Sequence, residues 1–140
     1  MGAWGQKLMT IDENDVAVAT RGGIEAVVRA MGAHTSSAIV QEHGCGAVCN
    51  ISLNDENQVA VAAKGGIEAV VSAMGEHRSC ESVQAQGCLA LKNIASSSSR
   101  RHSHVLSAGA VPLLVEALSA FPDRELFQKW GKLFLEELGS

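Results

Sequence analysis

The side chains best suited to metal chemistry lie close together in the first half of the chain. His43, Cys45 and Cys49 fall within about two helical turns, and thiolate and imidazole are the usual protein ligands of zinc. The sequence has no two cysteines separated by two residues, and a structural zinc site normally needs four such ligands. We therefore predict no metal and no other cofactor, and we interpret the cysteines as small buried apolar groups.

Two asparagines carry the most versatile polar group in the sequence. Asn50 and Asn93 are each followed by isoleucine. An amide both donates and accepts, so it can pair with any peptide unit whatever its side chain. One such bond contributes about 1 kcal/mol net, so affinity needs several. Two roles stay open with equal weight: contact with a ligand, or satisfaction of backbone groups between neighbouring parts of the fold.

A serine-rich segment holds a candidate modification site. Ser103 follows Arg100, Arg101 and His102, a context that basophilic kinases prefer, and a phosphate there would place negative charge near the start of a helix. The favoured alternative is a plain solvated loop over residues 96–104.

Catalysis finds no support in the sequence. An enzyme needs a nucleophile, a base and an orienting group in one pocket, but the hydroxyl groups cluster in loop-like segments and no phosphate-binding loop of the GxxxxGK type occurs. We predict that the protein is not an enzyme.

An internal repeat of 43 residues organises the chain. The segment Gly22–Val28 recurs as Gly65–Val71. Between residues 12–52 and 55–95 about 26 of 41 positions are identical, and the period lies in the range of helical repeats. A diverged copy follows after one inserted residue. We predict one domain over residues 1–140, made of a partial repeat (1–10), two close copies (11–53 and 54–96) and a closing copy (97–140).

Each copy predicts three helices. In the second copy a short helix over 59–63 follows Asn54 and Asp55, which are good helix caps. Gly65 and Gly66 then break the chain. A second helix starts at Ile67 with apolar residues at i, i+3, i+4 and i+7, and a third helix covers residues 82–95. The predicted fold class is all-α.

Composition and charge limit the classes of partner that we expect for the protein. Hydrophobic residues make up 46% of the chain, mostly small aliphatic ones, and aromatic residues only 4%. A net charge of -4 argues against nucleic-acid binding, and no apolar run approaches the ~20 residues that cross a bilayer. Four cysteines without a secretion signal read as reduced thiols. We predict a cytoplasmic protein, with the nucleus as the other option, and neither nucleic acid nor membrane as partner.

The helix order and the glycine turns resemble the armadillo repeat. The segments that carry this resemblance are Gly65–Ile67, Ala108–Leu114, Gly44–Ile51 and Gly87–Ile94. The resemblance implies a right-handed α-α superhelix of about three repeats plus a partial N-terminal helix. It also implies a concave groove, lined by the third helices, that binds proteins or extended peptides, with Asn50 and Asn93 on the ligand backbone.

Helical spacing extends this groove to the positions four and seven residues before each asparagine. They are Gly46, His43, Leu89 and Gln86, with Trp130 in the closing copy and Lys92 beside the groove. For Trp130 a core-capping role is favoured over a groove role. Import-type armadillo proteins carry tryptophan where this chain has Gly46 and Leu89, so nuclear-localisation peptides are not supported as ligands. Lys92 fits acidic ligands instead.

We therefore expect a non-enzymatic scaffold that binds a protein or an extended peptide. The alternative is a fragment or an engineered minimal module without a native ligand. An open first repeat exposes apolar surface, which predicts a homodimer formed through the N-terminal helix surface.

Overall fold

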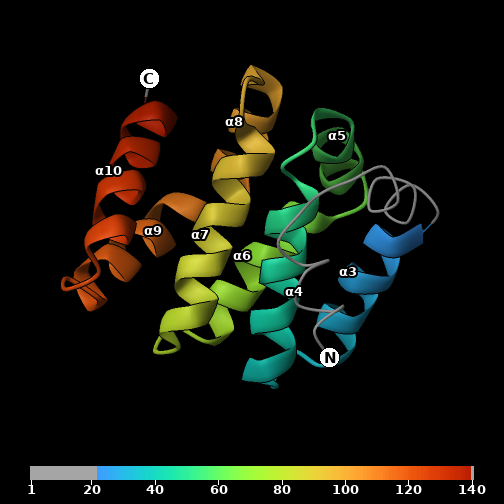
Figure 1. Cartoon of the computed structure of the whole chain (residues 1–140), viewed down its shortest axis with the longest axis horizontal. Helices are drawn as coiled ribbons and strands as arrows, with labels where there is room; N and C mark the ends of the chain where they lie inside the picture. Colours follow the sequence, from blue (N-terminus) through green and yellow to red (C-terminus); the bar gives the residue numbers. More distant parts are fainter. Residues whose placement is uncertain (1–21, 140) are drawn as a thin grey trace, which may run out of the picture.

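The computed structural model describes residues 22–139, and in that range the chain is helical without any strand. The partial repeat predicted over residues 1–10, and the first helix of the following copy, lie outside this range. The helices, shown in Figure 1, are α3 (Ile24–Ala33), α4 (Ala38–Ile51), α5 (Asp55–Ala63), α6 (Gly66–Glu76), α7 (Glu81–Ala95), α8 (Ser99–Ser107), α9 (Ala110–Ala120) and α10 (Glu125–Gly139). The predicted all-α class is confirmed for the described residues.

The helices follow the predicted order of three per copy. Short first helices are α5 and α8, second helices are α3, α6 and α9, and third helices are α4, α7 and α10. Second helices contact second helices and third helices contact third helices from one copy to the next. Figure 1 shows α4, α7 and α10 succeeding one another along the long axis. The third helices therefore form one continuous layer.

The predicted caps and turns lie at the helix starts, although α5 begins at Asp55, four residues before the predicted start at Val59. The side chain of Asn54 accepts hydrogen bonds from the backbone N–H groups of Glu56 and Asn57 at 3.0 and 3.3 Å, so α5 begins at Asp55. Gly65 has a φ of 88°, a left-handed conformation that costs a residue without Cβ little. This turn allows α6 to leave α5 at a sharp angle.

The prediction of a loop over residues 96–104 is wrong. Helix α8 occupies most of this segment, with Ser98 as its N-cap, accepting from the backbone N–H of Arg101 at 3.2 Å. Arg101 also donates to the backbone oxygens of Ile94 and Ser96 and to the side chain of Gln58. The cap and this arginine tie the serine-rich segment to α7 and α5, which local sequence cannot reveal.

One glutamine in each copy, buried in the first two and partly buried in the closing one, joins the third helix to the end of the second. Gln84 is 2% exposed, and its Nε2 donates to the carbonyl oxygens of Met74 and His77, both at 2.9 Å. These carbonyls belong to the last turn of α6, where helical partners run out. The same pair of bonds joins Gln41 to Met31 and His34, and Gln128 to Leu118 and Phe121.

A glycine on each third helix faces the second helix of the same copy. A Cβ added at Gly87 would come within 2.7 Å of Met74 Cγ, and one at Gly44 within 2.5 Å of Met31 Cγ. Gly131 stands in the same relation to Leu118. These contacts are too close for any side chain on the third helix, so glycine sets the distance between the two helices.

None of the helices in residues 22–139 combines the length and the apolar character needed to cross a bilayer. Helices α8 and α9 satisfy both criteria only when taken together across a bend of 76°.

We predict that Gln84→Met lowers the free energy of unfolding by about 1–2 kcal/mol, because the Met74 carbonyl loses the donor of its side-chain hydrogen bond and the His77 carbonyl keeps only the backbone N–H of Cys80. The matched control is Gln86→Met, an exposed position on the same helix, which should change stability by less than about 0.5 kcal/mol. Urea denaturation followed by circular dichroism measures both. Equal stability of the two variants would show that the buried amide does not hold the helices together.

Candidate functional site

A small hollow between α4 and α7 collects four of the predicted groove residues. Its volume is about 200 Å³. It is lined by Glu42, His43, Gly46, Ala47, Asn50 and Gln86. Five of these residues come from α4, and Gln86 reaches it from α7. We call this site the polar hollow, since most of its functional groups are amides, a carboxylate and an imidazole.

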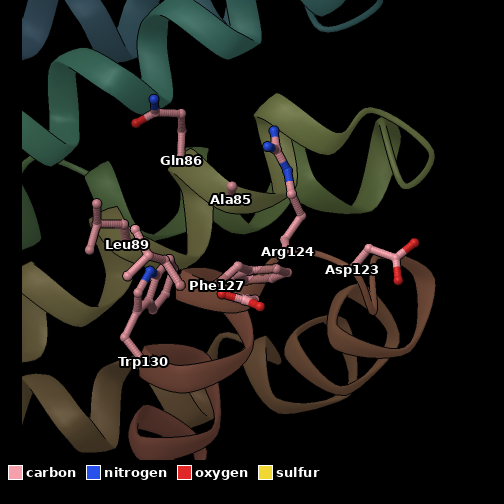
Figure 2. A pocket seen from close by; sticks show the side chains of 9 residues that line it. Ala85, Gln86, Leu89, Asp123, Arg124, Phe127 and Trp130 are labelled. Carbon is pink, nitrogen blue, oxygen red and sulfur yellow. The ribbon is translucent and has the colours of Figure 1, made fainter.

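A larger hollow lies between α7 and α10. Its volume is about 520 Å³, and it collects the predicted residues Gln86, Leu89 and Trp130 (Figure 2). The full lining is Ala85, Gln86, Leu89, Asp123, Arg124, Glu125, Leu126, Phe127 and Trp130. In Figure 2 the side chains of Leu89 and Trp130 lie close together, and Gln86 extends toward α4. We call this site the aromatic hollow.

The two hollows occupy the same place in successive copies. Glu42, His43 and Gly46 line the polar hollow, and the residues 43 positions later, Ala85, Gln86 and Leu89, line the aromatic one. Gln86 closes the first hollow from the next helix as Trp130 closes the second. The third-helix surface therefore carries a repeated depression whose lining changes along the molecule from mainly polar to a mixture of large apolar and charged side chains.

Asn93 takes up one of the two roles left open by the sequence. Its Nδ2 donates to the carbonyl oxygen of Cys49 at 3.1 Å and lies 3.4 Å from the Cys49 sulfur. This bond satisfies a backbone group of the preceding third helix. Asn93 and its partly buried neighbour Lys92 line neither hollow, whereas Asn50 lines the polar one. Asn50 thus lies in a hollow on the third-helix surface, whereas Asn93 bonds to the neighbouring third helix.

Trp130 combines the two roles considered for it. Its ring is partly buried against the core and packs edge-on to Phe127, with ring centroids 5.2 Å apart and planes at 61°. Phe127 is 4% exposed. The same tryptophan also lines the aromatic hollow. The buried phenylalanine therefore fixes the orientation of a ring whose other side stays accessible.

Sequence reasoning missed the residues supplied by the connection between α9 and α10. Leu126 is 77% exposed although it is apolar, and Arg124, which lines the aromatic hollow, forms an ion pair with Glu81 at the start of α7. An exposed leucine at the start of an amphipathic helix was the available signal. The path of the connection, which brings it beside α7, is not encoded locally.

The three candidate metal ligands, His43, Cys45 and Cys49, lie in different environments. Cys45 and Cys49 are buried at 0% and 5% exposure, whereas His43 is exposed. Burial raises the pKa of the Cys45 thiol to about 12 and that of Cys49 to about 11, and it also raises the pKa of Cys88. Metal binding requires thiolate, which these environments disfavour. The thiols pack between the third helices as apolar groups.

The candidate phosphorylation site lies on a helix. Ser103 is an exposed residue of α8, and its carbonyl oxygen accepts from the Ser107 hydroxyl at 2.9 Å. Arg101, part of the predicted kinase context, is engaged in the contacts with Ile94, Ser96 and Gln58 described above. A kinase that reads an extended segment would have to unwind α8 first.

Comparisons with known proteins give no match that bears on the function of these hollows. No family model, no curated protein and no solved structure matches the chain. The armadillo resemblance and the function it implies therefore rest on the residues and contacts of this chain.

We predict that one of the four thiols reacts rapidly with DTNB in the native protein at pH 8. Cys80 is partly exposed, whereas the raised pKa leaves about one Cys49 thiol in a thousand ionised at that pH. Absorbance kinetics with and without guanidinium chloride measure the reactive fraction. Cys80→Ser serves as the control and should remove the fast phase. A second fast thiol would mean that the α4–α7 layer opens in solution.

Proposed function

We propose that the chain is a non-enzymatic scaffold of the armadillo type, in which the third helices form a groove for an extended peptide or a protein segment. In this proposal the copies stack as a right-handed α-α superhelix. The order of three helices per copy, the left-handed glycine at Gly65 and Gly109, and the contacts between equivalent helices support it. A layer of equivalent helices is the arrangement in which repeat proteins build extended binding surfaces.

One observation carries the proposal: α4 and α7 share half of their aligned residues and differ at three positions that face the hollows. Seven positions carry the same residue in both helices. They are Val40, Gln41, Gly44, Cys45, Ala47, Asn50 and Ile51 with their counterparts 43 residues later. Of the α4 positions that line the polar hollow, Ala47 and Asn50 are kept, whereas Glu42, His43 and Gly46 change. A scaffold that reads a ligand residue by residue needs this combination of a fixed frame and variable contacts.

The proposed groove offers a peptide backbone two amide groups. Asn50 lines the polar hollow, and Gln86 lines both hollows from an exposed position. Each amide can donate to and accept from a peptide unit, and each pairing contributes about 1 kcal/mol net. In this proposal useful affinity therefore comes from side chains that fill the hollows, while the amides keep the ligand extended and in register.

The proposal also names a compartment. The sequence contains four cysteines, and all four are free thiols, which fits a reducing environment. We place the protein in the cytoplasm, with the nucleus as the other option, and we expect neither nucleic acid nor membrane as partner.

Self-association is a second candidate, supported by unequal burial at equivalent positions. In the second and closing copies the positions are fully or nearly buried; they are Val70, Val83, Leu114 and Phe127. Their counterparts in α3 and α4, Val27 and Val40, are only partly buried and line an apolar hollow of about 330 Å³ with Ile39, which is 70% exposed. A second copy bound on this α3–α4 face would cover it and give a homodimer.

The groove is tested by Gln86→Arg, which fills the boundary between the two hollows from an exposed position. Peptides are first selected on the wild-type protein from a random phage-displayed library, and their affinities are then measured by fluorescence anisotropy. We expect Gln86→Arg to weaken the selected peptides at least about tenfold, while Glu56→Arg on α5, also exposed, leaves them unchanged. Equal effects of the two variants would remove the groove from the proposal.

The dimer is tested by Ile39→Asp, which places a charge in the apolar hollow without disturbing a buried contact. Light scattering should give about twice the chain mass of 14.6 kDa for the wild type at high concentration and the single mass for the variant. Val59→Asp, at a position 58% exposed on α5, is the control. A wild type that stays monomeric throughout would exclude the dimer.

A further inference from the structure

The aromatic hollow differs from its counterpart in size and in the nature of its walls. It has more than twice the volume of the polar hollow, about 520 against 200 Å³. Gly46 is replaced by Leu89 and Gln86 by Trp130 at the equivalent positions, and Leu126 adds an apolar side chain that is 77% exposed. The apolar walls and the depth supplied by the α9–α10 connection suit a large hydrophobic side chain.

The rim of the aromatic hollow carries uncompensated negative charge. Asp123 and Glu125 line it as exposed carboxylates, while the positive charge of Arg124 is paired with Glu81. The lysines nearby on α10, Lys129 and Lys132, do not line the hollow. The polar hollow adds a further carboxylate, that of Glu42. A ligand in this part of the groove therefore meets a field that favours positive charge.

We propose that the aromatic hollow is the subsite that takes a bulky apolar side chain of an extended peptide, with a lysine or arginine next to it in the peptide. Leu89, Leu126 and Trp130 contact the apolar side chain, and Asp123 and Glu125 attract the neighbouring cation. The proposal rests on the proposed peptide-binding function and gives it a sequence preference. It differs from the expectation drawn from Lys92, which favours acidic ligands.

The fixed orientation of Trp130 strengthens this assignment. Phe127 holds the indole from the core side, so the ring keeps its place without a ligand and loses little conformational freedom when one binds. Residues that dominate the binding energy of protein interfaces are enriched in tryptophan and cluster in well-packed pockets. Leu126, exposed at the start of α10, is the side chain that can close over the ligand.

The test uses the emission of Trp130 in a Trp4→Phe background, where it is the single tryptophan of the chain. The probes are Gly/Ser host peptides that carry a central Phe–Lys, Ala–Lys or Phe–Glu pair. We expect Phe–Lys to shift the emission saturably and to bind about tenfold more tightly than either of the other two. Equal binding of Phe–Lys and Ala–Lys, or a preference for Phe–Glu, would overturn the proposal.

Variants assign the effect to the residues named. Leu126→Ala should weaken Phe–Lys about fivefold, whereas the matched control Val115→Ala, an exposed apolar residue of α9 outside the hollow, should not. Asp123→Asn combined with Glu125→Gln should abolish the preference for Phe–Lys over Phe–Glu. If Leu126→Ala and Val115→Ala have the same effect, or the charge preference survives, the subsite is wrongly assigned.

Two further outcomes separate this proposal from the proposed function. If library-selected peptides bind with Gln86-dependent affinity but leave the Trp130 emission unchanged, the groove stands and the subsite fails. If no peptide binds in a Gln86-dependent way, both fail. Emission that changes with protein concentration in the absence of peptide would show that a second copy occupies the hollow, which also overturns the proposal.

Discussion

The hydrogen bonds from one glutamine amide per copy are the interaction on which the rest of the structure depends. Helix C-termini leave carbonyl groups without helical partners, and burying them unpaired costs about 1–3 kcal/mol each. Gln41, Gln84 and Gln128 each donate from one nitrogen to two carbonyls at such an end, and one carbonyl of each pair also accepts from a backbone N–H three residues later. Because the same bonds recur in all three copies, the second and third helices are joined in the same way in each of them.

Small residues complete this frame. Gly44 and Gly87 bring the third helices against methionines of the second helices, and Cys45 and Cys88 fill the layer with thiols that burial keeps protonated. The large share of glycine and alanine in the sequence thus reflects close approach at defined positions. Gly46 has a different use, because it packs against no second helix and leaves the floor of the polar hollow open.

Most of the frame could be predicted from the sequence because its causes are local. The period, the cap at Asn54 and the turn at Gly65 depend on residues within a few positions of one another. Helix α8 was missed although its cap at Ser98 is local, and the bond from Arg101 to Gln58, 43 residues earlier, is the contact that local sequence could not reveal. Spacing along one helix brought His43, Gly46 and Asn50 together correctly. Leu126 and Arg124 escaped prediction because the α9–α10 connection determines where they lie.

Different sides of each third helix make different contacts, which explains how the hollows can differ while the copies stay alike. One side of α7 is occupied by the glutamine tie and the glycine contact, and another by the neighbouring third helix, where Asn93 bonds to Cys49. The remaining side faces the hollows and is less buried, with Gln86 exposed and Leu89 only partly buried against the core, so its residues change between copies. Each hollow nevertheless takes residues from two successive helices, and Gln86 belongs to both. A change at this residue therefore alters two neighbouring hollows at once, and in the proposed groove this couples the preferences of adjacent hollows for ligand side chains.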